Sequence, residues 1–186
     1  NIKNEIKENF PYVVMYEAKC EADDIIATLV KYYHQHEDIM IVSGDKDFIQ
    51  LQQYNNVKQY APIQKQFVGE DIDPKVFLQE QILKGDRSDG VPNILSDDDV
   101  FVTGEKQKPM TKKRIEEFSV LENHTPYISK NYNRNKMLID LTQIPPAYEE
   151  SIINNYQKYK VNDRSKLLTY FIENKLKSLM ENIGDF

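Results

Sequence analysis

Three groups of carboxylates stand where secondary-structure elements of the chain are expected to begin or end. They are Glu21, Asp23 and Asp24; Asp45 and Asp47; and Asp86 and Asp89. Sites that offer oxygen ligands, with no cysteine or histidine close by, favour Mg²⁺ or Mn²⁺ over zinc. Two such ions about 4 Å apart can activate a water and stabilise the leaving oxygen of a phosphodiester. The residue types therefore favour phosphodiester hydrolysis by two metal ions.

Each group taken alone has an ordinary structural explanation. An aspartate in a first helical turn often only caps the helix, and an Asp-x-Asp after a strand is often a solvated turn. The combination is more informative, because all three groups lie beside an expected element. In open α/β sheets ligands gather outside the carboxyl ends of strands, so we expect the first two groups to meet in one crevice.

The pattern of apolar residues supplies the elements that would position these carboxylates. Apolar residues at helical spacing predict a helix over 22–33, directly at the first group. An apolar strand over 39–42 precedes the second group, and a short helix follows it. Asp73-Pro74 predicts the start of a helix that runs to Gly85, just before the third group.

The remaining elements complete an α/β layer followed by helices. We expect a helix tail over 2–10, a buried strand at 12–15, a further strand at 57–61 and an irregular segment over 86–111. Helices are expected at 111–119, 125–140 and 147–158, and a final helix from about residue 163. Strands alternate with helices in the first half, whereas helices alone fill the second half. We therefore predict an α/β domain over 1–85 and a helical domain over 86–186.

The overall charge bears on a nucleic-acid partner. The formal net charge is −6 and the pI about 5.2, which argues mildly against a simple nucleic-acid binder. The basic residues could nevertheless be concentrated in one patch, and the segment 104–114 contains five of them: Lys106, Lys108, Lys112, Lys113 and Arg114. Such a patch can contact phosphates without reading sequence. A solvated helix face is the alternative interpretation.

Other features bear on the cellular setting. Cys20 is the single cysteine, so it forms no internal disulfide, and no Cys/His spacing suggests a zinc site. No apolar run approaches the length of a membrane helix, and no secretory leader is recognisable at the N-terminus. We therefore expect a reducing, intracellular (cytoplasmic) setting.

Three motifs of the chain resemble the consecutive metal-site motifs of the 5′ nucleases. They are Glu21-Ala22-Asp23-Asp24-Ile25-Ile26-Ala27, Ser43-Gly44-Asp45-Lys46-Asp47-Phe48-Ile49-Gln50-Leu51 and Leu83-Lys84-Gly85-Asp86-Arg87-Ser88-Asp89-Gly90. That family includes flap endonucleases, the 5′ nuclease domain of bacterial DNA polymerase one, and phage exonucleases. Segments 133–140 and 183–186 are also similar to the C-terminal region of the phage ribonucleases H in this family.

This resemblance implies a fold and an activity. The family fold is a three-layer α/β/α (PIN-like) nuclease domain followed by a helical domain. The family activity is Mg²⁺-dependent 5′→3′ exonuclease and flap cleavage of RNA–DNA and DNA duplexes, used for primer removal in replication. A phage protein acting in the bacterial cytoplasm is implied, with replication proteins such as a single-strand-binding protein or a sliding clamp as partners.

The resemblance also assigns roles to individual residues. Carried over by motif position, Glu21, Asp23, Asp45, Asp47, Asp86 and Asp89 are expected as metal ligands. Of these, Asp23, Asp45 and Asp47 are the expected catalytic residues, and Asp24 is expected to support the ligands without touching metal. The basic patch of 104–114 matches the region with which the family grips the duplex.

The resemblance covers the carboxyl-terminal two-thirds of the family pattern. Family members begin with a longer segment that supplies a central strand, two further aspartates and a basic arch. An incomplete fragment is therefore implied. We expect the 186-residue chain by itself to bind metal weakly and to show little or no nuclease activity.

Two alternatives belong to other functional classes. Asp45-Lys46-Asp47 after an apolar strand also fits a phosphatase in which Asp45 is a covalent nucleophile. The last motif there follows a strand, whereas here it follows a helix. The second alternative is a catalytically inert DNA-binding or partner-binding fragment. In that reading the C-terminal helix, with Met180 and Phe186, docks on a replication protein instead of packing in a core.

Overall fold

The computed structural model describes residues 2–186 and divides the chain into two compact units. The first unit combines the residues up to Ile25 with Pro146–Phe186, and the second is Ile26–Pro145. The division falls inside helix α2 (Ala22–Tyr33). The boundary predicted from the sequence, between residues 85 and 86, stays a prediction.

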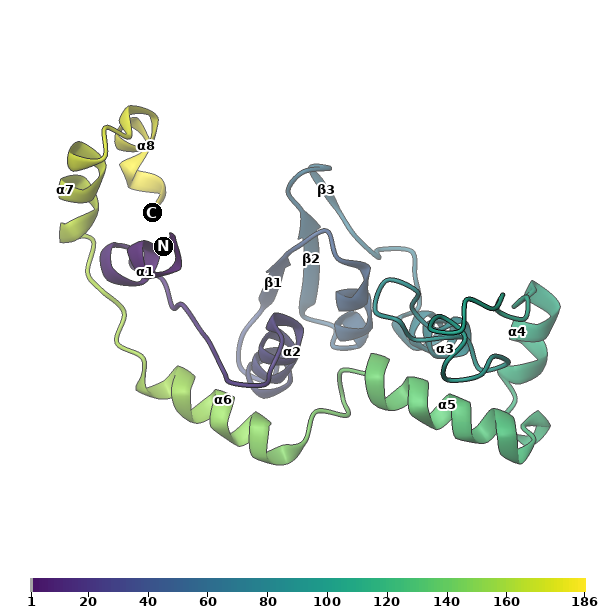
Figure 1. Cartoon of the computed structure of the whole chain (residues 1–186). Coiled ribbons are helices and arrows are strands. Elements are labelled where there is room, and N and C mark those ends of the chain that lie inside the picture. Colours follow the sequence, from purple (N-terminus) through teal and green to yellow (C-terminus); the bar gives the residue numbers. More distant parts are fainter. Residues whose placement is uncertain (1) are drawn as a thin grey trace. The chain divides into compact units, whose positions relative to one another are not determined.

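A small mixed sheet lies in the second unit (Figure 1). Strand β1 (Ile39–Val42) runs parallel to β2 (Val57–Ala61), with Ile39 opposite Val57 and Val42 opposite Tyr60. Strand β3 (Gln66–Phe67) pairs antiparallel to β2, so the strand order is β1-β2-β3. The parallel connection passes through η1 (Lys46–Gln53), a 3-10 helix that begins directly after the carboxyl end of β1.

One face of this sheet forms the first hydrophobic core. The buried cluster brings together side chains from α2, β1, η1 and β2: Ala27, Val30, Ile41, Phe48, Leu51 and Val57. Alternate residues of β1 point the other way, and Met40 and Val42 are 48% and 65% exposed. The helical layer therefore covers one face of the sheet, and it holds η1 and α2 firmly beside the end of β1.

A second core forms around helix α3 (Pro74–Lys84). Asp73 caps this helix by accepting hydrogen bonds from the backbone N–H groups of Lys75 and Val76. Its end packs with α4 (Lys112–Phe118) and α5 (Pro126–Ile139), and a short 3-10 helix, η2 (Leu121–Asn123), joins the latter two. The cluster comprises Leu83, Ile94, Leu95, Phe118 and Ile128.

Buried asparagines of α5 fasten the irregular segment that follows α3. The amide of Asn131 donates to the carbonyls of Ile94 and Ser96, and that of Asn135 donates to those of Ile82 and Pro92. Both side chains are almost fully buried. Because these bonds satisfy carbonyls that no helix or strand satisfies, the irregular segment has a defined course.

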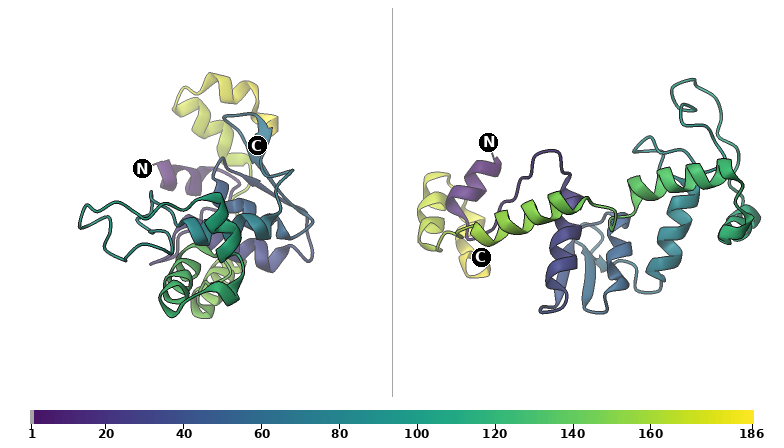
Figure 2. Two further views of the ribbon diagram at one scale, coloured as in Figure 1. Left: turned by 90° about the vertical axis from the view of Figure 1, so that its right-hand side faces the viewer. Right: turned by 90° about the horizontal axis from the view of Figure 1, so that it is seen from below.

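The first unit contains the two ends of the described chain (Figure 2). Helix α1 (Ile2–Asn9) packs against α7 (Ser165–Glu173), which is preceded by α6 (Pro146–Lys158) and followed by α8 (Lys177–Glu181) and η3 (Ile183–Asp185). The rings of Phe10, Phe171 and Phe186 contact one another edge to face. This aromatic cluster joins segments from opposite ends of the sequence.

Most of the elements expected from the sequence are confirmed, and two expectations are wrong. Residues 12–15 are not a strand, because no strand of the described chain pairs with them, and they are partly exposed. The single helix expected from about residue 163 is two helices, because Lys175 adopts a positive φ of 56° between α7 and α8. Met180 and Phe186 therefore do not belong to one continuous helix.

Two smaller findings concern the cellular setting. Cys20 is a free thiol. Among the helices of residues 2–186, none combines the length and the apolar character that crossing a membrane requires.

Candidate metal centre

The turn after β1 places Asp45 at the start of η1. Asp45 is the N-cap of this helix, and its Oδ1 accepts a hydrogen bond of 3.1 Å from the backbone N–H of Asp47. The buried side chain of Gln59, on β2, donates to the backbone carbonyls of Ser43 (2.8 Å) and Asp45 (2.5 Å). A neighbouring strand thus fixes the turn that presents the Asp45 carboxylate.

Asp47 lies in the first turn of η1 and is the most constrained of these acids. Its Oδ1 accepts a hydrogen bond of 2.6 Å from the side-chain amide of Gln81 on α3. Burial raises the pKa of Asp47; the Gln81 hydrogen bond opposes this, and the neighbouring charges of Asp45, Asp86 and Asp89 add to the rise. A carboxylate in this position gains from a nearby cation, which would compensate both the burial and the repulsion.

Asp86 and Asp89 follow the end of α3. Asp86 Oδ1 accepts hydrogen bonds from the backbone N–H and hydroxyl of Ser88 and from the N–H of Asp89. The Ser88 hydroxyl is the main reason that the pKa of Asp86 lies below its usual range. The turn therefore holds Asp86 ionised, in a fixed place close to Asp47.

Gly85 makes this turn possible. Its φ is 68° with ψ near 180°, and a Cβ added there would lie 2.4 Å from the carbonyl oxygen of Val91 and 2.6 Å from the carbonyl carbon of Pro92. A residue with a side chain would have to push this backbone away.

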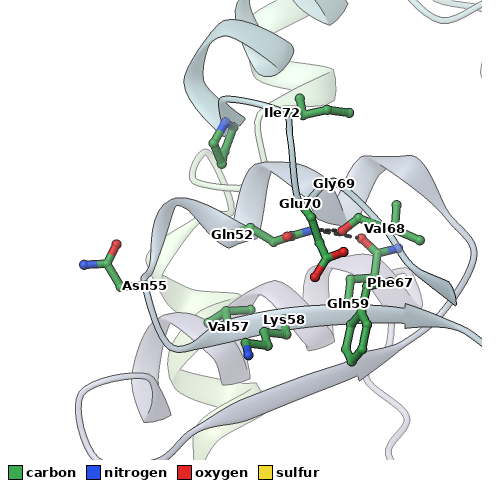
Figure 3. Close-up of a pocket in the computed structure, with 11 residues that line it drawn as sticks. Gln52, Asn55, Val57, Lys58, Gln59, Phe67, Val68, Gly69, Glu70 and Ile72 are labelled. Carbon is green, nitrogen blue, oxygen red and sulfur yellow. Dashed lines mark hydrogen bonds between the residues drawn. The ribbon is translucent and has the colours of Figure 1, made fainter.

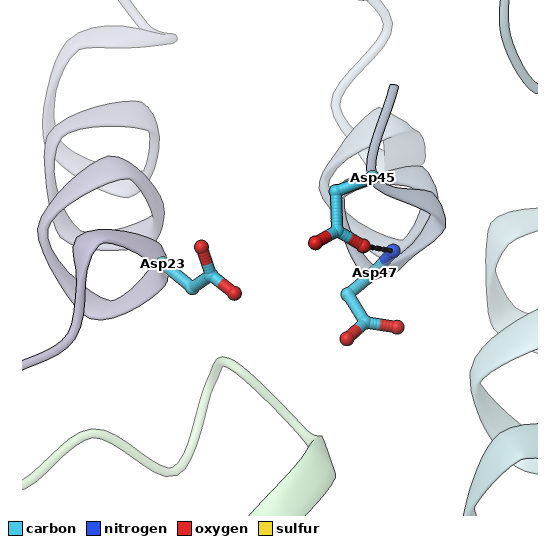
Figure 4. Close-up of side chains that lie close together, drawn as sticks. All are labelled: Asp23, Asp45 and Asp47. Atoms are coloured by element: carbon cyan, nitrogen blue, oxygen red, sulfur yellow. Dashed lines mark hydrogen bonds between the residues drawn. The ribbon is translucent and has the colours of Figure 1, made fainter. Parts of the chain in front are cut away.

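Asp23 approaches from the first turn of α2. Its helix continues into the first core, where Ala27 and Val30 are buried, so the packing of the helix fixes this turn near the start of η1. Figure 4 shows the carboxylate of Asp23 turned toward those of Asp45 and Asp47. One oxygen from each of the three carboxylates lies within 4.8 Å of the others.

The carboxylates form two groups that share one member. The first is Asp23, Asp45 and Asp47, and the second is Asp47, Asp86 and Asp89; in each, ligand atoms from all three residues lie within 4.8 Å of one another. A carboxylate has two oxygens, so Asp47 could contribute to both groups. The arrangement fits hard divalent cations, because all six ligand positions offer oxygen.

The other two acids of the first motif lie outside these groups. Glu21 is exposed and precedes the first residue of α2. The Asp24 carboxylate accepts a hydrogen bond of 2.9 Å from the backbone N–H of Glu21, which caps the helix. Asp24 therefore has a capping role, and within the described residues Glu21 is not among the clustered ligands.

Two of the five basic residues of 104–114 make contacts within the chain, and the other three are exposed. The guanidinium of Arg114 donates to the carbonyl of Pro109 (2.7 Å), and the ammonium of Lys108 lies 5.7 Å from the ring centroid of Tyr127. Lys106, Lys112 and Lys113 are exposed, and no ion pair involves them in the described part of the chain. This patch is therefore accessible only in part.

A separate pocket of about 280 Å³ lies beside β2 and β3 (Figure 3). There the amide of Gln52 donates to the carbonyl of Val68 (3.0 Å) and to the side-chain oxygen of Gln59 (3.4 Å). The charged residues that line it are Lys58 and Glu70. None of the clustered aspartates lines this pocket, but Gln52 in its wall donates to Gln59, the residue that fixes the turn before η1.

Three positioning residues were not anticipated from the sequence. Gln59 and Gln81 act through side-chain hydrogen bonds across 14 and 34 residues, and no local pattern encodes such distances. Gly85 could have been recognised in part, because a glycine after a helix and before an acidic turn often marks a backbone position closed to side chains.

Comparisons with known proteins identify the family of the chain. Residues 72–186 match the family model for T4 RNase H, C terminal, and residues 1–81 match that for the N-terminal resolvase-like domain of 5′-3′ exonucleases. The chain is 35% identical to the Ribonuclease H of Enterobacteria phage T4 over 98% of its own length, and it spans 63% of the length of that relative.

Other relatives match shorter parts of the chain. The DNA polymerase I of Streptococcus pneumoniae is 36% identical over 49% of the chain and 13% of the polymerase. The 5′-3′ exonuclease of Buchnera aphidicola is 38% identical over 40% of the chain and 28% of that exonuclease. The predicted fold class, a partial α/β nuclease-type domain followed by a helical C-terminal region, is confirmed by these matches. The chain belongs to the T4 RNase H family and carries a 5′-3′ exonuclease-type N-terminal region.

Proposed function

We propose that the protein to which this chain belongs is a metal-dependent 5′ nuclease that hydrolyses phosphodiester bonds. The observation that carries the proposal is the pair of aspartate groups sharing Asp47, because two adjacent oxygen sites suit two divalent ions. Relatives named Ribonuclease H and 5′-3′ exonuclease support the same reaction class. RNA–DNA and DNA duplexes or flaps met during replication are the proposed substrates, and replication proteins are proposed partners.

The residues would divide the work as follows. Asp23 and Asp45, with one oxygen of Asp47, would hold one ion, and Asp86 and Asp89, with the other oxygen, would hold the second. Mg²⁺ or Mn²⁺ bound there would supply an activated water and charge stabilisation for the leaving oxygen. Gln81 and the 86–89 turn keep the acids in place before the ions arrive.

Hydrolysis does not require a covalent enzyme intermediate in this arrangement. In this proposal Asp45 is a metal ligand and not a nucleophile; its Oδ1 accepts the N–H of Asp47, and its carboxylate lies close to two other acids. The clustering of five acids favours metal binding over a phosphatase with a lone nucleophile. Failure to trap a phosphorylated Asp45 is the expected result of a direct test.

Cleavage of a 5′-labelled flap and of an RNA–DNA duplex tests the proposal. It is measured with Mg²⁺, using the protein that contains this chain, and the 186-residue chain is assayed beside it. Asp47→Asn should lower the rate about 100-fold or more, since each factor of ten corresponds to about 1.4 kcal/mol of transition-state stabilisation.

Asp38→Asn is the matched control, because Asp38 is exposed and outside both aspartate groups. It should leave the rate unchanged. Mg²⁺-dependent cleavage by Asp47→Asn at the parent rate would overturn the proposal. Salt-sensitive duplex binding with no cleavage by the parent protein would instead favour an inert nucleic-acid-binding protein.

A further inference from the structure

A basic cleft lies within the first compact unit, away from the aspartates described above. It is shallow, has a volume of about 620 Å³, and is formed by α1 and by the segment from the end of α6 to the start of α7. Its lining residues are Asn4, Lys7, Glu8, Lys158, Tyr159, Lys160, Asn162 and Lys166. All of them belong to one unit, so the cleft is a feature of that unit alone.

The charge of this cleft is strongly positive in an otherwise acidic chain. Four lysines line it, against the single acid Glu8. Across residues 2–186 none of these four ammonium groups makes an ion pair. Four like charges gathered in one place repel one another unless an anion joins them. The cleft therefore favours an anionic ligand.

The walls of the cleft are held by contacts other than ion pairs. The side-chain amide of Asn162 donates to the backbone carbonyl of Lys7 (2.7 Å), which joins α1 to the segment before α7. The Lys7 ammonium lies 5.9 Å from the ring centroid of Tyr159, and the Lys166 ammonium donates to the carbonyl of Glu8 (3.3 Å). Lys158 and Lys160 are exposed on either side of Tyr159.

The hydroxyl of Tyr159 is a second and independent feature. It is buried, and no residue of the described chain offers it a hydrogen-bond partner. A buried hydroxyl without a partner is unfavourable, because it has lost its hydrogen bonds to water. Because Tyr159 lines the cleft, a small movement of its side chain when a phosphate enters could give the hydroxyl a phosphate oxygen or a water as its partner.

We propose that this cleft binds the backbone phosphates of a nucleic acid. Lysine ammonium groups suit phosphates as point charges and carry no base specificity, which fits a nuclease that acts at many sequences. The identity of the polyanion rests on the proposed function, whereas the preference for phosphate rests on the cleft itself. The cleft adds a contact surface to the one predicted at 104–114, where Lys108 and Arg114 are already engaged within the chain.

Equilibrium binding without cleavage tests this inference. A short fluorescent DNA duplex is titrated with the chain in EDTA, at several salt concentrations, and fluorescence anisotropy is recorded. The test variant is Lys7→Gln/Lys158→Gln/Lys160→Gln, which leaves the hydrogen-bonded Lys166 in place. The matched control is Lys58→Gln/Lys65→Gln/Lys75→Gln, which removes the same charge from exposed positions of the second unit.

The expected result is a weaker and less salt-dependent complex for the test variant. Each lost phosphate contact lowers the slope of log K against log salt by about 0.9, so three contacts lower it by roughly 2 to 3. Affinity at low salt should fall about tenfold or more, and the control should stay within about twofold of the parent. Equal slopes for the test and control variants would overturn the inference.

Two further outcomes separate this inference from its alternatives. If the test variant loses binding to anionic phospholipid vesicles but binds the duplex as the parent does, the inference is overturned and the cleft is a membrane-binding surface. The binding assay needs no catalysis. It can therefore support the phosphate-binding cleft even if Asp47→Asn cleaves at the parent rate and so refutes the proposed function. Conversely, if Asp47→Asn loses cleavage as expected but the test variant binds the duplex as the parent does, only the inference about the cleft is refuted.

Discussion

The substitution Gly85→Ala should be the most disruptive small change near the aspartates. With φ at 68° and ψ near 180°, Gly85 occupies a backbone region that side chains rarely enter, and entry costs about 1 to 3 kcal/mol. The new Cβ would also lie 2.4 Å from the Val91 carbonyl oxygen, so this backbone must move. The move strains the hydrogen bond from the Val91 N–H to the Asp86 carbonyl, now 2.7 Å long, which contributes about 1 kcal/mol.

We therefore expect Gly85→Ala to lower the free energy of unfolding by about 3 to 5 kcal/mol. Gly104→Ala is the matched control: φ there is 74°, but nothing lies within 4 Å of the added Cβ, so only the backbone cost of about 1 to 2 kcal/mol remains. Urea unfolding of both variants measures the difference from their midpoints. Equal destabilisation by the two substitutions would refute the reasoning from the close contact.

Three other predictions concern the hydrogen bonds and charges around the aspartates. Gln81→Leu removes the donor to Asp47, so the pKa of Asp47 should rise further and Mn²⁺ affinity should fall about tenfold, as measured by electron paramagnetic resonance. Asn135→Ala leaves the buried carbonyl of Ile82 without a donor, while Arg134 still donates to the carbonyl of Pro92, so it should cost about 1 to 3 kcal/mol in urea unfolding; Asn123→Ala, at an exposed bond, should cost less than about 1 kcal/mol. Asp47→Asn should stabilise the metal-free chain in EDTA at pH values above the folded-state pKa of Asp47, because the raised pKa means that ionisation of Asp47 opposes folding. The gain in the free energy of unfolding should shrink as the pH falls through that pKa and vanish below the unfolded-state pKa. A gain that stays constant at all pH values would contradict this prediction.

Most local elements and part of the grouping of the aspartates could be predicted from the sequence. Helix 74–84, for example, follows from a capping aspartate, a proline in the first turn and a glycine at the end, all of which are local signals. The meeting of Asp23 with Asp45 and Asp47 could be anticipated, because both groups lie at expected element ends of one α/β layer. The approach of Asp86 and Asp89 to Asp47 was expected only from the resemblance to the 5′ nucleases.

The failures have a different physical origin. Tyr12–Met15 is apolar and β-branched, but a strand also needs a neighbour to receive its hydrogen bonds, and the described chain supplies none. The break at Lys175 depends on a positive φ that lysine seldom adopts, so no propensity argument would place it. The roles of Gln59 and Gln81 could not be predicted either, because a glutamine that bridges two elements cannot be told from other polar residues in the sequence.

The two aspartate groups share one member, so substitutions at different aspartates should affect the binding of different numbers of ions. Asp47 belongs to both groups, whereas Asp86 belongs to one. Removing the Asp47 carboxylate should therefore weaken the binding of two ions, whereas removing that of Asp86 should weaken the binding of one. Asp38, which belongs to neither group, again provides the control.

The most direct test is a Mn²⁺ titration of the chain followed by electron paramagnetic resonance, comparing the parent with Asp47→Asn, Asp86→Asn and Asp38→Asn. We predict two weak sites in the parent and in Asp38→Asn, one site retained in Asp86→Asn, and loss of both in Asp47→Asn. Binding by Asp47→Asn that matches the parent would contradict the claim that these aspartates form a shared metal centre.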